Sequence, residues 1–199
     1  MSSLIYKNIR IYRSVMQLLY RGKYYRRFDP VKLLIDQSNP QSVLELCFGD
    51  LVMARYCRER NCKWYGIDRN ESFIDYAIDE GFAAEKKVID ANYEFMKTDL
   101  ILMMGSLYHF NEKAAVIVKN MMKSANRIII SEPVKNISSN RLYGKIAGKF
   151  SDSGSGSENF RFTRKSLTDM AAIVCADSLF SYKIVHEGEK DLILIFERK

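Results

Sequence analysis

The apolar positions of this chain fall into short runs and helical stripes that alternate along its middle. Residues 43–50, VLELCFGD, begin with a near-continuous apolar run and end in a glycine turn, which is typical of a buried central strand. The next residues, LVMARYCRER, place apolar positions before charged ones and predict a helix that leaves the turn. A strand, a glycine turn and a helix N-terminus together form a place where backbone N–H groups converge on a ligand.

The alternation of strands and helices continues through the middle of the chain. Four further strands are predicted, at residues 63–68, 87–89, 98–105 and 127–133. Helical patterns over residues 71–80 and 112–123 lie between them. Strands and helices that alternate in this way predict βαβ units and therefore a parallel sheet.

The end of the chain predicts a helix and then a hairpin. Thr163 is placed to cap a helix over residues 164–177. The segments FSYKIVHEG and DLILIFERK follow as two strands joined so closely that they must pair antiparallel. A dinucleotide dehydrogenase domain would instead be expected to end with another parallel strand.

Two segments stand apart from this pattern. Residues 1–39 predict a basic, helical N-terminal arm, whose second short helix begins at Asp29 and Pro30. Residues 134–162 are rich in Ser, Gly, Asn and Lys, and they predict a lid-like insertion with a basic, amphipathic middle, NRLYGKIAGKF. We therefore expect one domain over residues 40–199, with the arm before it.

Composition and cysteine usage narrow the class of protein. A chain of 199 residues that is 47% hydrophobic suits one folded globular domain. No apolar run approaches the ~20 residues that a membrane-spanning helix needs, and the N-terminus lacks the features of a secretory signal. Four scattered cysteines without a C-x-x-C pair, together with two histidines, argue against a zinc site and predict reduced thiols in a cytoplasmic protein.

The net charge of +7 belongs to the arm, because residues 1–27 carry seven basic side chains and no acidic one. One interpretation is a helix that packs its apolar side on the domain and keeps its basic side in water. The alternatives are a helix on an anionic membrane surface, a flap over the active site, or a contact with nucleic acid. Attachment to the periphery of a membrane therefore stays open, and the oligomeric state is not indicated.

The turn after the first strand carries a resemblance to a known family. The first motif of the class I S-adenosylmethionine-dependent methyltransferases is an acidic residue followed by alternating glycines, E/D-x-G-x-G. Glu45 matches the acidic position and Gly49 the second glycine, whereas Cys47 stands where the first glycine is usual. The chain resembles this family over residues 40–198. The resemblance implies a Rossmann-like methyltransferase fold, with a mainly parallel seven-stranded sheet, flanking helices and a C-terminal antiparallel hairpin.

The expected cofactor residues follow the strands in order. Asp68 ends the second strand, 23 residues after Glu45, and an acidic residue at this spacing accepts hydrogen bonds from ribose hydroxyls in Rossmann-type sites. The alternative is that Asp68 caps the helix that follows. The resemblance implies that S-adenosylmethionine binds across these strand ends. Its contacts would be Glu45, Cys47, Phe48 and Gly49 at the methionine part, Asp68 and Arg69 at the ribose, and Asp90 and Ala91 at the adenine.

The segment GSLYHF after the fourth strand is expected to face the acceptor. By the resemblance, Gly105, Ser106, Tyr108 and His109 would border the reacting methyl group. We predict Tyr108 and His109 as catalytic residues, since an imidazole can act as a general base near neutral pH. The alternative is a structural histidine packed under the following helix. The [N/D]-P-P-[Y/F/W] signature of enzymes that methylate base amino groups is absent here, which argues against that target.

The sequence thus predicts an enzyme that transfers a methyl group from S-adenosylmethionine to an oxygen or nitrogen of a small-molecule acceptor and releases S-adenosylhomocysteine. The placement of charge favours an anionic acceptor, or one linked to a lipid or glycan. Two alternatives stay open. One is a non-catalytic Rossmann-like binding module, suggested by Cys47, and the other is an RNA methyltransferase tethered by the arm. Nucleic acid is the less favoured partner, because nothing in residues 28–199 requires it.

Overall fold

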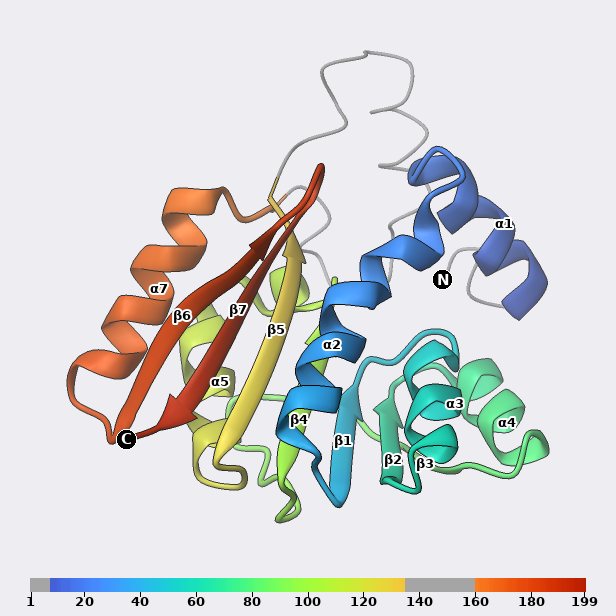
Figure 1. The fold of residues 1–199 in the computed structure, drawn as a ribbon, viewed down its shortest axis with the longest axis horizontal. Coiled ribbons are helices and arrows are strands. Elements are labelled where there is room, and N and C mark those ends of the chain that lie inside the picture. The colour runs from blue at the N-terminus through green and yellow to red at the C-terminus, as the bar shows by residue number, and fades with distance from the viewer. Residues whose placement is uncertain (1–7, 135–159) are drawn as a thin grey trace.

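Figure 1 shows a computed structural model of the protein, which describes residues 8–134 and 160–199. Its centre is one seven-stranded sheet in the order β3-β2-β1-β4-β5-β7-β6. The strands are β1 (Ser42–Leu46), β2 (Lys63–Asp68), β3 (Ala83–Lys86), β4 (Leu100–Met104), β5 (Arg127–Pro133), β6 (Phe180–Glu187) and β7 (Asp191–Arg198). Strands β1 to β5 pair in parallel, while β7 runs antiparallel to both β5 and β6. The predicted parallel sheet and its closing hairpin are confirmed.

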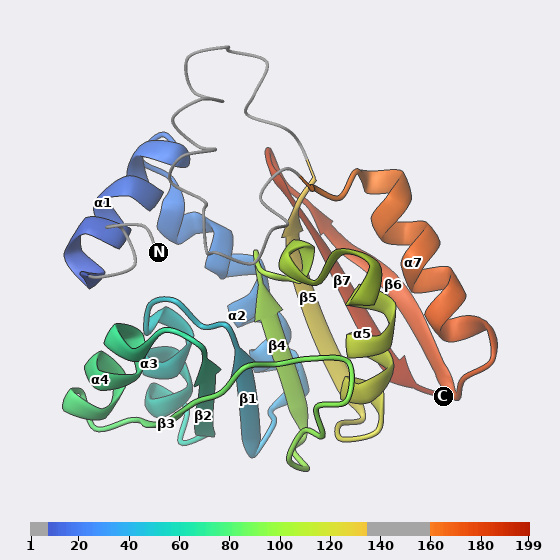
Figure 2. The ribbon, with the colours of Figure 1, turned by 180° about the vertical axis from the view of Figure 1, so that it is seen from behind.

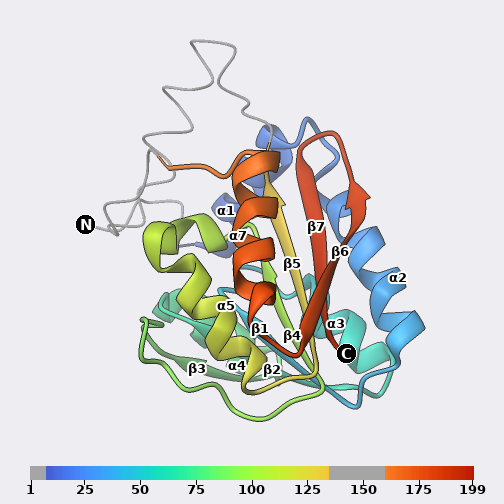
Figure 3. The same ribbon diagram turned by 90° about the vertical axis from the view of Figure 1, so that its left-hand side faces the viewer.

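Helices cover both faces of this sheet, as the views in Figures 2 and 3 show. The α-helices are α1 (Ile9–Leu19), α2 (Asp29–Ser38), α3 (Val52–Glu59), α4 (Glu71–Asp79), α5 (Ala114–Met122) and α7 (Arg164–Ala176). Two 3₁₀ helices, η2 (Tyr24–Phe28) and η3 (Leu107–Lys113), precede α2 and α5. Helices α5 and α7 lie on one face, and α2 and α3 lie on the other.

The alternation of side chains along each strand divides the core into two layers. Successive residues of a strand point to opposite faces. Leu44 and Ile101 accordingly pack in the layer under α5 and α7, and their neighbours Val43 and Leu100 pack in the layer under α2 and α3. All four are buried. Burial on both faces explains why these strands read as near-continuous apolar runs.

The third strand was predicted in the wrong place. It was expected at residues 87–89, but β3 is Ala83–Lys86 and pairs with β2 from Tyr65↔Ala83 to Asp68↔Lys86. β3 is an edge strand, so backbone pairing holds it and its side chains need not be apolar. The apolar Val88, which suggested the later position, is 73% exposed in the loop that follows.

The helix predicted over residues 112–123 also has a different start. A 3₁₀ turn, η3, begins at Leu107, and the α-helix α5 begins only at Ala114. Asn111 kinks η3 within its length, because its φ of 43° and ψ of −117° are not helical. Residues 107–113 therefore form a separate 3₁₀ element between β4 and α5.

Helix α7 begins where the sequence predicts it, directly after Thr163. Thr163 caps α7 in a reciprocal pair: its hydroxyl accepts from the amide of Ser166, and the Ser166 hydroxyl accepts from the amide of Thr163. At the other end of the described chain, α1 lies beyond the C-terminal ends of the parallel strands (Figures 1 and 2). The insertion predicted over residues 134–162 falls almost wholly on residues 135–159, which lie outside the described residues. Among the helices described, none is long and apolar enough to cross a membrane.

Candidate functional site

A cavity of about 1150 Å³ opens at the C-terminal ends of the parallel strands. In open α/β sheets, ligands bind at this edge, where the strand order reverses, and here that point lies between β1 and β4. The wall comes from the turn after β1, the start of α4, the loop after β3, the turn after β4 and the arm. Its residues are Tyr12, Met16, Arg27, Cys47, Gly49, 68–73, 86–90, 104–106 and 108–113.

The turn after β1 contains two residues in the left-handed backbone conformation that glycine favours. Cys47 and Gly49 both adopt left-handed φ values, of 54° and 61°. A β-carbon on Gly49 would lie 2.7 Å from the hydroxyl oxygen of Tyr12, so this position has no room for a side chain. Cys47 therefore takes the conformation of the usual glycine and places its side chain on the cavity wall. Burial raises the pKa of its thiol well above the ordinary value, so the thiol is neutral.

Asp68 connects the first two turns of the site. Its side-chain carboxylate accepts hydrogen bonds from the amide of Asn70 at 2.8 Å and from the amide of Gly49 at 3.4 Å. Burial raises the pKa of Asp68 to about 6, against the opposing effect of these hydrogen bonds. Asn70 caps α4, since its side chain accepts from the amide of Ser72. The alternative role of Asp68 as the cap of that helix is therefore wrong.

Glu45 and Phe48 lie behind the turn and do not form part of the cavity wall. The Glu45 carboxylate is buried and accepts a hydrogen bond from the indole N–H of Trp64 at 2.8 Å. Burial raises the pKa of Glu45 well above its ordinary value. The Phe48 ring packs edge-to-face on Trp64, with 5.2 Å between the ring centroids. Both residues support the turn from the side opposite the cavity.

The predicted site residues thus separate into two groups. Those that the structure brings together on the cavity wall are Cys47, Gly49, Asp68, Arg69, Asp90, Gly105, Ser106, Tyr108 and His109. Those that are not on the wall are Glu45, Phe48 and Ala91.

The turn after β4 is anchored by a glutamate at the end of β5. Glu132 is fully buried, and its Oε1 accepts from the amides of Ser106 at 2.7 Å and Leu107 at 2.6 Å. These bonds fix the start of η3, which carries the predicted catalytic residues. Burial raises the pKa of Glu132 from 4.5 to about 7, and its Oε2 has no hydrogen-bond partner in the part of the chain that the structure describes.

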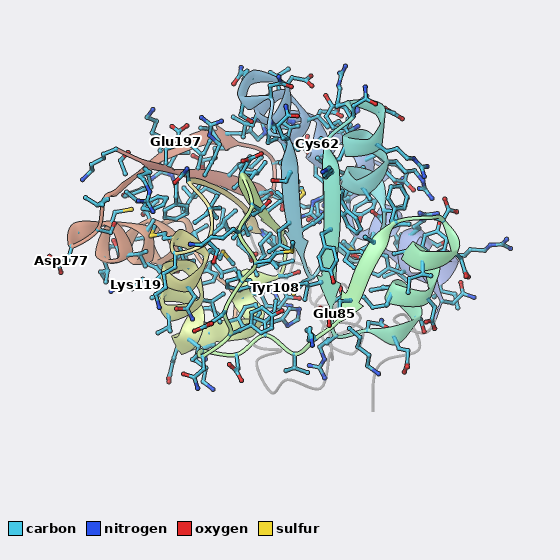
Figure 4. The ribbon with its side chains drawn as sticks, turned by 90° about the horizontal axis from the view of Figure 1, so that it is seen from below. Cys62, Glu85, Tyr108, Lys119, Asp177 and Glu197 are labelled. Carbon is cyan, nitrogen blue, oxygen red and sulfur yellow. The ribbon has the colours of Figure 1, made fainter. Side chains whose placement is uncertain are left out.

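Tyr108 and His109 form an aromatic pair on the cavity wall. Their ring centroids lie 4.0 Å apart, and the guanidinium carbon of Arg161 lies 3.9 Å from the centroid of the Tyr108 ring. Figure 4 shows Tyr108 between the half of the sheet that carries α5 and the half that ends in β3. Burial, together with the charges of Arg161 and Arg69, lowers the pKa of His109 to about 4. The imidazole is therefore neutral at ordinary pH.

The arm supplies wall residues that the sequence did not single out. Tyr12, Met16 and Arg27 all face the cavity. The side chain of Arg27 is only 6% exposed, so the interpretation of the arm as a helix with a fully solvated basic side fails at this residue. The interpretation as a flap over the site agrees with this geometry. No feature of the sequence distinguishes Arg27 from Arg26, its exposed neighbour.

Comparisons with known proteins find similarity in structure but not in sequence. A scan against protein-family models finds no match, and a search of curated proteins finds none either. A possible histamine N-methyltransferase from Thermotoga maritima, described as S-adenosylmethionine-dependent, is 17% identical, with a TM-score of 0.66 over 98% of this chain and 99% of that chain.

Two further solved structures contain S-adenosylhomocysteine. The plantazolicin methyltransferase BamL, in complex with a desmethylplantazolicin analogue and S-adenosylhomocysteine, is 14% identical, with a TM-score of 0.65 over 93% of this chain and 90% of that chain. Magnesium protoporphyrin IX methyltransferase from Synechocystis PCC 6803, with bound S-adenosylhomocysteine, is 14% identical, with a TM-score of 0.59 over 96% of this chain and all of that chain. The chain has the Rossmann-like fold of these methyltransferases, and the predicted fold class is confirmed.

The raised pKa of Glu132 generates a testable pH dependence of stability. A carboxyl group whose pKa is higher in the folded state favours folding most when it is protonated. Its contribution is thus complete below about pH 4.5 and is lost as the pH rises through about 7. Glu132→Gln cannot ionise but keeps an oxygen for the two amides. We expect the variant to gain up to about 3 kcal/mol over the wild type between pH 4.5 and 8.

Urea unfolding of both proteins at several pH values measures this difference. Other titrating groups are common to the two proteins and cancel in the comparison. A stability difference that stays constant across this pH range would contradict the assignment.

Proposed function

We propose that the protein is an S-adenosylmethionine-dependent methyltransferase that acts on an oxygen or nitrogen atom of a small acceptor. The observation that carries the proposal is the buried carboxylate of Asp68 on the wall of a large cavity at the strand-order reversal. This is the position at which acidic residues hold ribose hydroxyls in Rossmann-type sites. The fold shared with known methyltransferases supports the same conclusion.

The residues present suit this cofactor. The cavity of about 1150 Å³ exceeds the range of roughly 300–1,000 Å³ that holds most small ligands, so it has room for a cofactor and part of an acceptor. Asp68 would accept the ribose hydroxyls, and Asp90 in the loop after β3 would meet the adenine. Cys47 and Gly49 would contact the methionine part. When bound, S-adenosylmethionine supplies a methyl group that a nucleophile can displace from sulfur.

Tyr108 and His109 are the residues that we assign to the acceptor side. A neutral imidazole can accept the proton that the acceptor's nucleophile loses, and His109 is neutral above about pH 4. The Tyr108 ring, which packs against both the His109 imidazole and the Arg161 guanidinium, would hold this base in position. Glu132 would act only through the position of η3. Much of the rate enhancement would then come from holding the reactants in line.

Asp68→Ala tests the cofactor site. We expect isothermal titration to show that the wild type binds S-adenosylmethionine and S-adenosylhomocysteine with micromolar affinity, about −8 kcal/mol. The variant should lose about 10- to 100-fold, because hydrogen bonds to a charged group contribute roughly 1.5–3 kcal/mol. Asp75→Ala, which removes an exposed carboxylate on α4, is the matched control and should bind normally. Failure of the wild type to bind either ligand would refute the enzymatic proposal.

The protonation state of His109 gives a second test that needs no acceptor. The chain has two histidines, so the signal that disappears from the proton NMR spectrum of His109→Asn identifies this residue. We expect that signal to titrate with a midpoint of about 4 and to stay constant between pH 5 and 8. A midpoint near 6.5 would show that the imidazole is exposed to water and would contradict its burial on the cavity wall.

The acceptor is proposed to be anionic, or linked to a lipid or glycan, on account of the arm. The outer side of α1 exposes Ile11 and Leu18, which are 46% and 62% accessible, beside the basic Arg10. Exposed apolar side chains flanked by basic ones are typical of a helix that lies on an anionic membrane surface. This supports attachment at the periphery of a membrane.

Sedimentation with vesicles tests this attachment. Deleting the arm is unsuitable, because Tyr24 and Phe28 belong to the core. We expect the wild type to sediment several-fold more with anionic phosphatidylglycerol vesicles than with neutral phosphatidylcholine vesicles, and Ile11→Ser with Leu18→Ser to abolish the difference. Ile173→Ser, an exposed apolar change on α7, is the control. Equal sedimentation of the wild type with both vesicle types would contradict the proposal.

A further inference from the structure

Arg27 is buried in surroundings that do not use its hydrogen-bonding capacity. Its guanidinium lies over the rings of Tyr20, Tyr24 and Phe28, at 4.9, 5.9 and 5.7 Å from their centroids. Aromatic faces stabilise a cation but accept no ordinary hydrogen bonds. A buried charge that lacks hydrogen bonds is costly, so the partners of this group decide what it does.

The protein supplies a counter-charge on one side of the guanidinium. Asp191 Oδ2 lies 3.3 Å from Arg27 Nε, and Asp191 Oδ1 accepts a hydrogen bond from the Tyr20 hydroxyl at 3.1 Å. The contact with Nε is an ion pair without hydrogen-bond geometry, and both Nε and Nη2 are buried without a hydrogen-bond partner among the described residues. A guanidinium presents five N–H donors in a plane. Because Arg27 lies on the cavity wall, an anion bound there would meet N–H donors that the described protein groups leave unused.

The Nη2 side of the guanidinium lies at one end of the cavity. A β-carbon built on Gly105 would lie 2.9 Å from Arg27 Nη2 and 3.4 Å from Nη1, so the guanidinium rests against the turn after β4. Along the sheet, Asp90 follows β3, Asp68 ends β2, and Cys47 follows β1. A cofactor with its ribose on Asp68 and its adenine toward β3 would extend its methionine part toward β4. Arg27 lies at that end.

Two of the other cations on the wall, Lys86 and Lys87, are less suited to this place. Lys86 lies at the end of β3 and pairs with Glu71 at 3.0 Å, and Lys87 next to it pairs with Glu85 at 2.9 Å. Both therefore lie on the adenine side of Asp68. A carboxylate matches a guanidinium in two parallel hydrogen bonds, a geometry that lysine does not offer.

We propose that Arg27 binds the carboxylate of the methionine part of the cofactor, which makes the N-terminal arm an integral part of the cofactor site. The inference rests on the proposed function. The place of Arg27 is set by contacts between the arm and the β6–β7 turn. Lys23 Nζ contacts Glu189 Oε1 at 2.6 Å, the Lys190 ammonium donates to the backbone carbonyl of Leu19, and Asp191 pairs with Arg27 itself. Asp191 is accordingly a positioning residue.

Two ligands that differ in the methionine part test the proposal. S-adenosylhomocysteine carries the carboxylate, whereas 5′-methylthioadenosine keeps the adenosine and the thioether but lacks it. Isothermal titration of both ligands into the wild type and Arg27→Met separates the contributions. We expect Arg27→Met to weaken S-adenosylhomocysteine binding about 10- to 100-fold, as loss of charge-assisted hydrogen bonds does, and to change 5′-methylthioadenosine binding less than about twofold.

The control variants separate this contact from a structural role. Arg26→Met removes the exposed neighbouring charge and should change neither affinity. Arg27→Lys keeps the buried charge for Asp191 but not the two-pronged geometry, so it should weaken S-adenosylhomocysteine alone. Unchanged 5′-methylthioadenosine binding also reports that each variant is folded.

The outcomes distinguish this inference from the proposed function. If Arg27→Met and Arg27→Lys weaken both ligands equally, or leave S-adenosylhomocysteine binding unchanged, the assignment of Arg27 is overturned while the methyltransferase proposal stands. If the wild type binds neither ligand, the proposed function fails and the inference fails with it. Selective loss of S-adenosylhomocysteine binding in both variants supports the assignment.

Discussion

The buried carboxylate of Asp68 is the interaction on which the rest of the site depends. It accepts from the amides of Gly49 and Asn70, and so it holds the turn after β1 against the turn after β2. These turns meet because parallel strands bring their C-terminal ends to one edge of the sheet. Removal of this carboxylate would take away the acceptor that joins the amides of Gly49 and Asn70, and with it the proposed acceptor for the ribose.

Buried ionisable groups recur around this edge, and each has a different role. Glu45 holds Trp64 behind the first turn, Glu132 holds the amides that begin η3, and Arg27 joins the arm to the hairpin through Asp191. Ionised groups are expensive to bury, which is why burial raises the pKa of both glutamates. Burial of these groups therefore costs folding stability at the strand ends, while their contacts hold the backbone that forms the cavity.

The sequence predicted the features that depend on local pattern. Apolar runs located β1, β4 and β5, and the spacing from Glu45 located Asp68 on the cavity wall. The sequence did not predict the features that tertiary contacts determine. Strand β3 forms by edge pairing at Ala83–Lys86, although the apolar residues that suggested a strand come later. The motif residue Glu45 faces Trp64 and not the cavity, and the burial of Arg27 depends on a hairpin more than 160 residues away, at Asp191.

A crystal structure of the protein grown with S-adenosylhomocysteine tests the central claim most directly. We expect the ribose hydroxyls within hydrogen-bonding distance, about 2.5–3.2 Å, of the Asp68 carboxylate. The methionine carboxylate should lie against Arg27, and the adenine should face the loop after β3. A ligand bound elsewhere, or one whose ribose does not contact Asp68, would contradict the assignment of this cavity as the cofactor site.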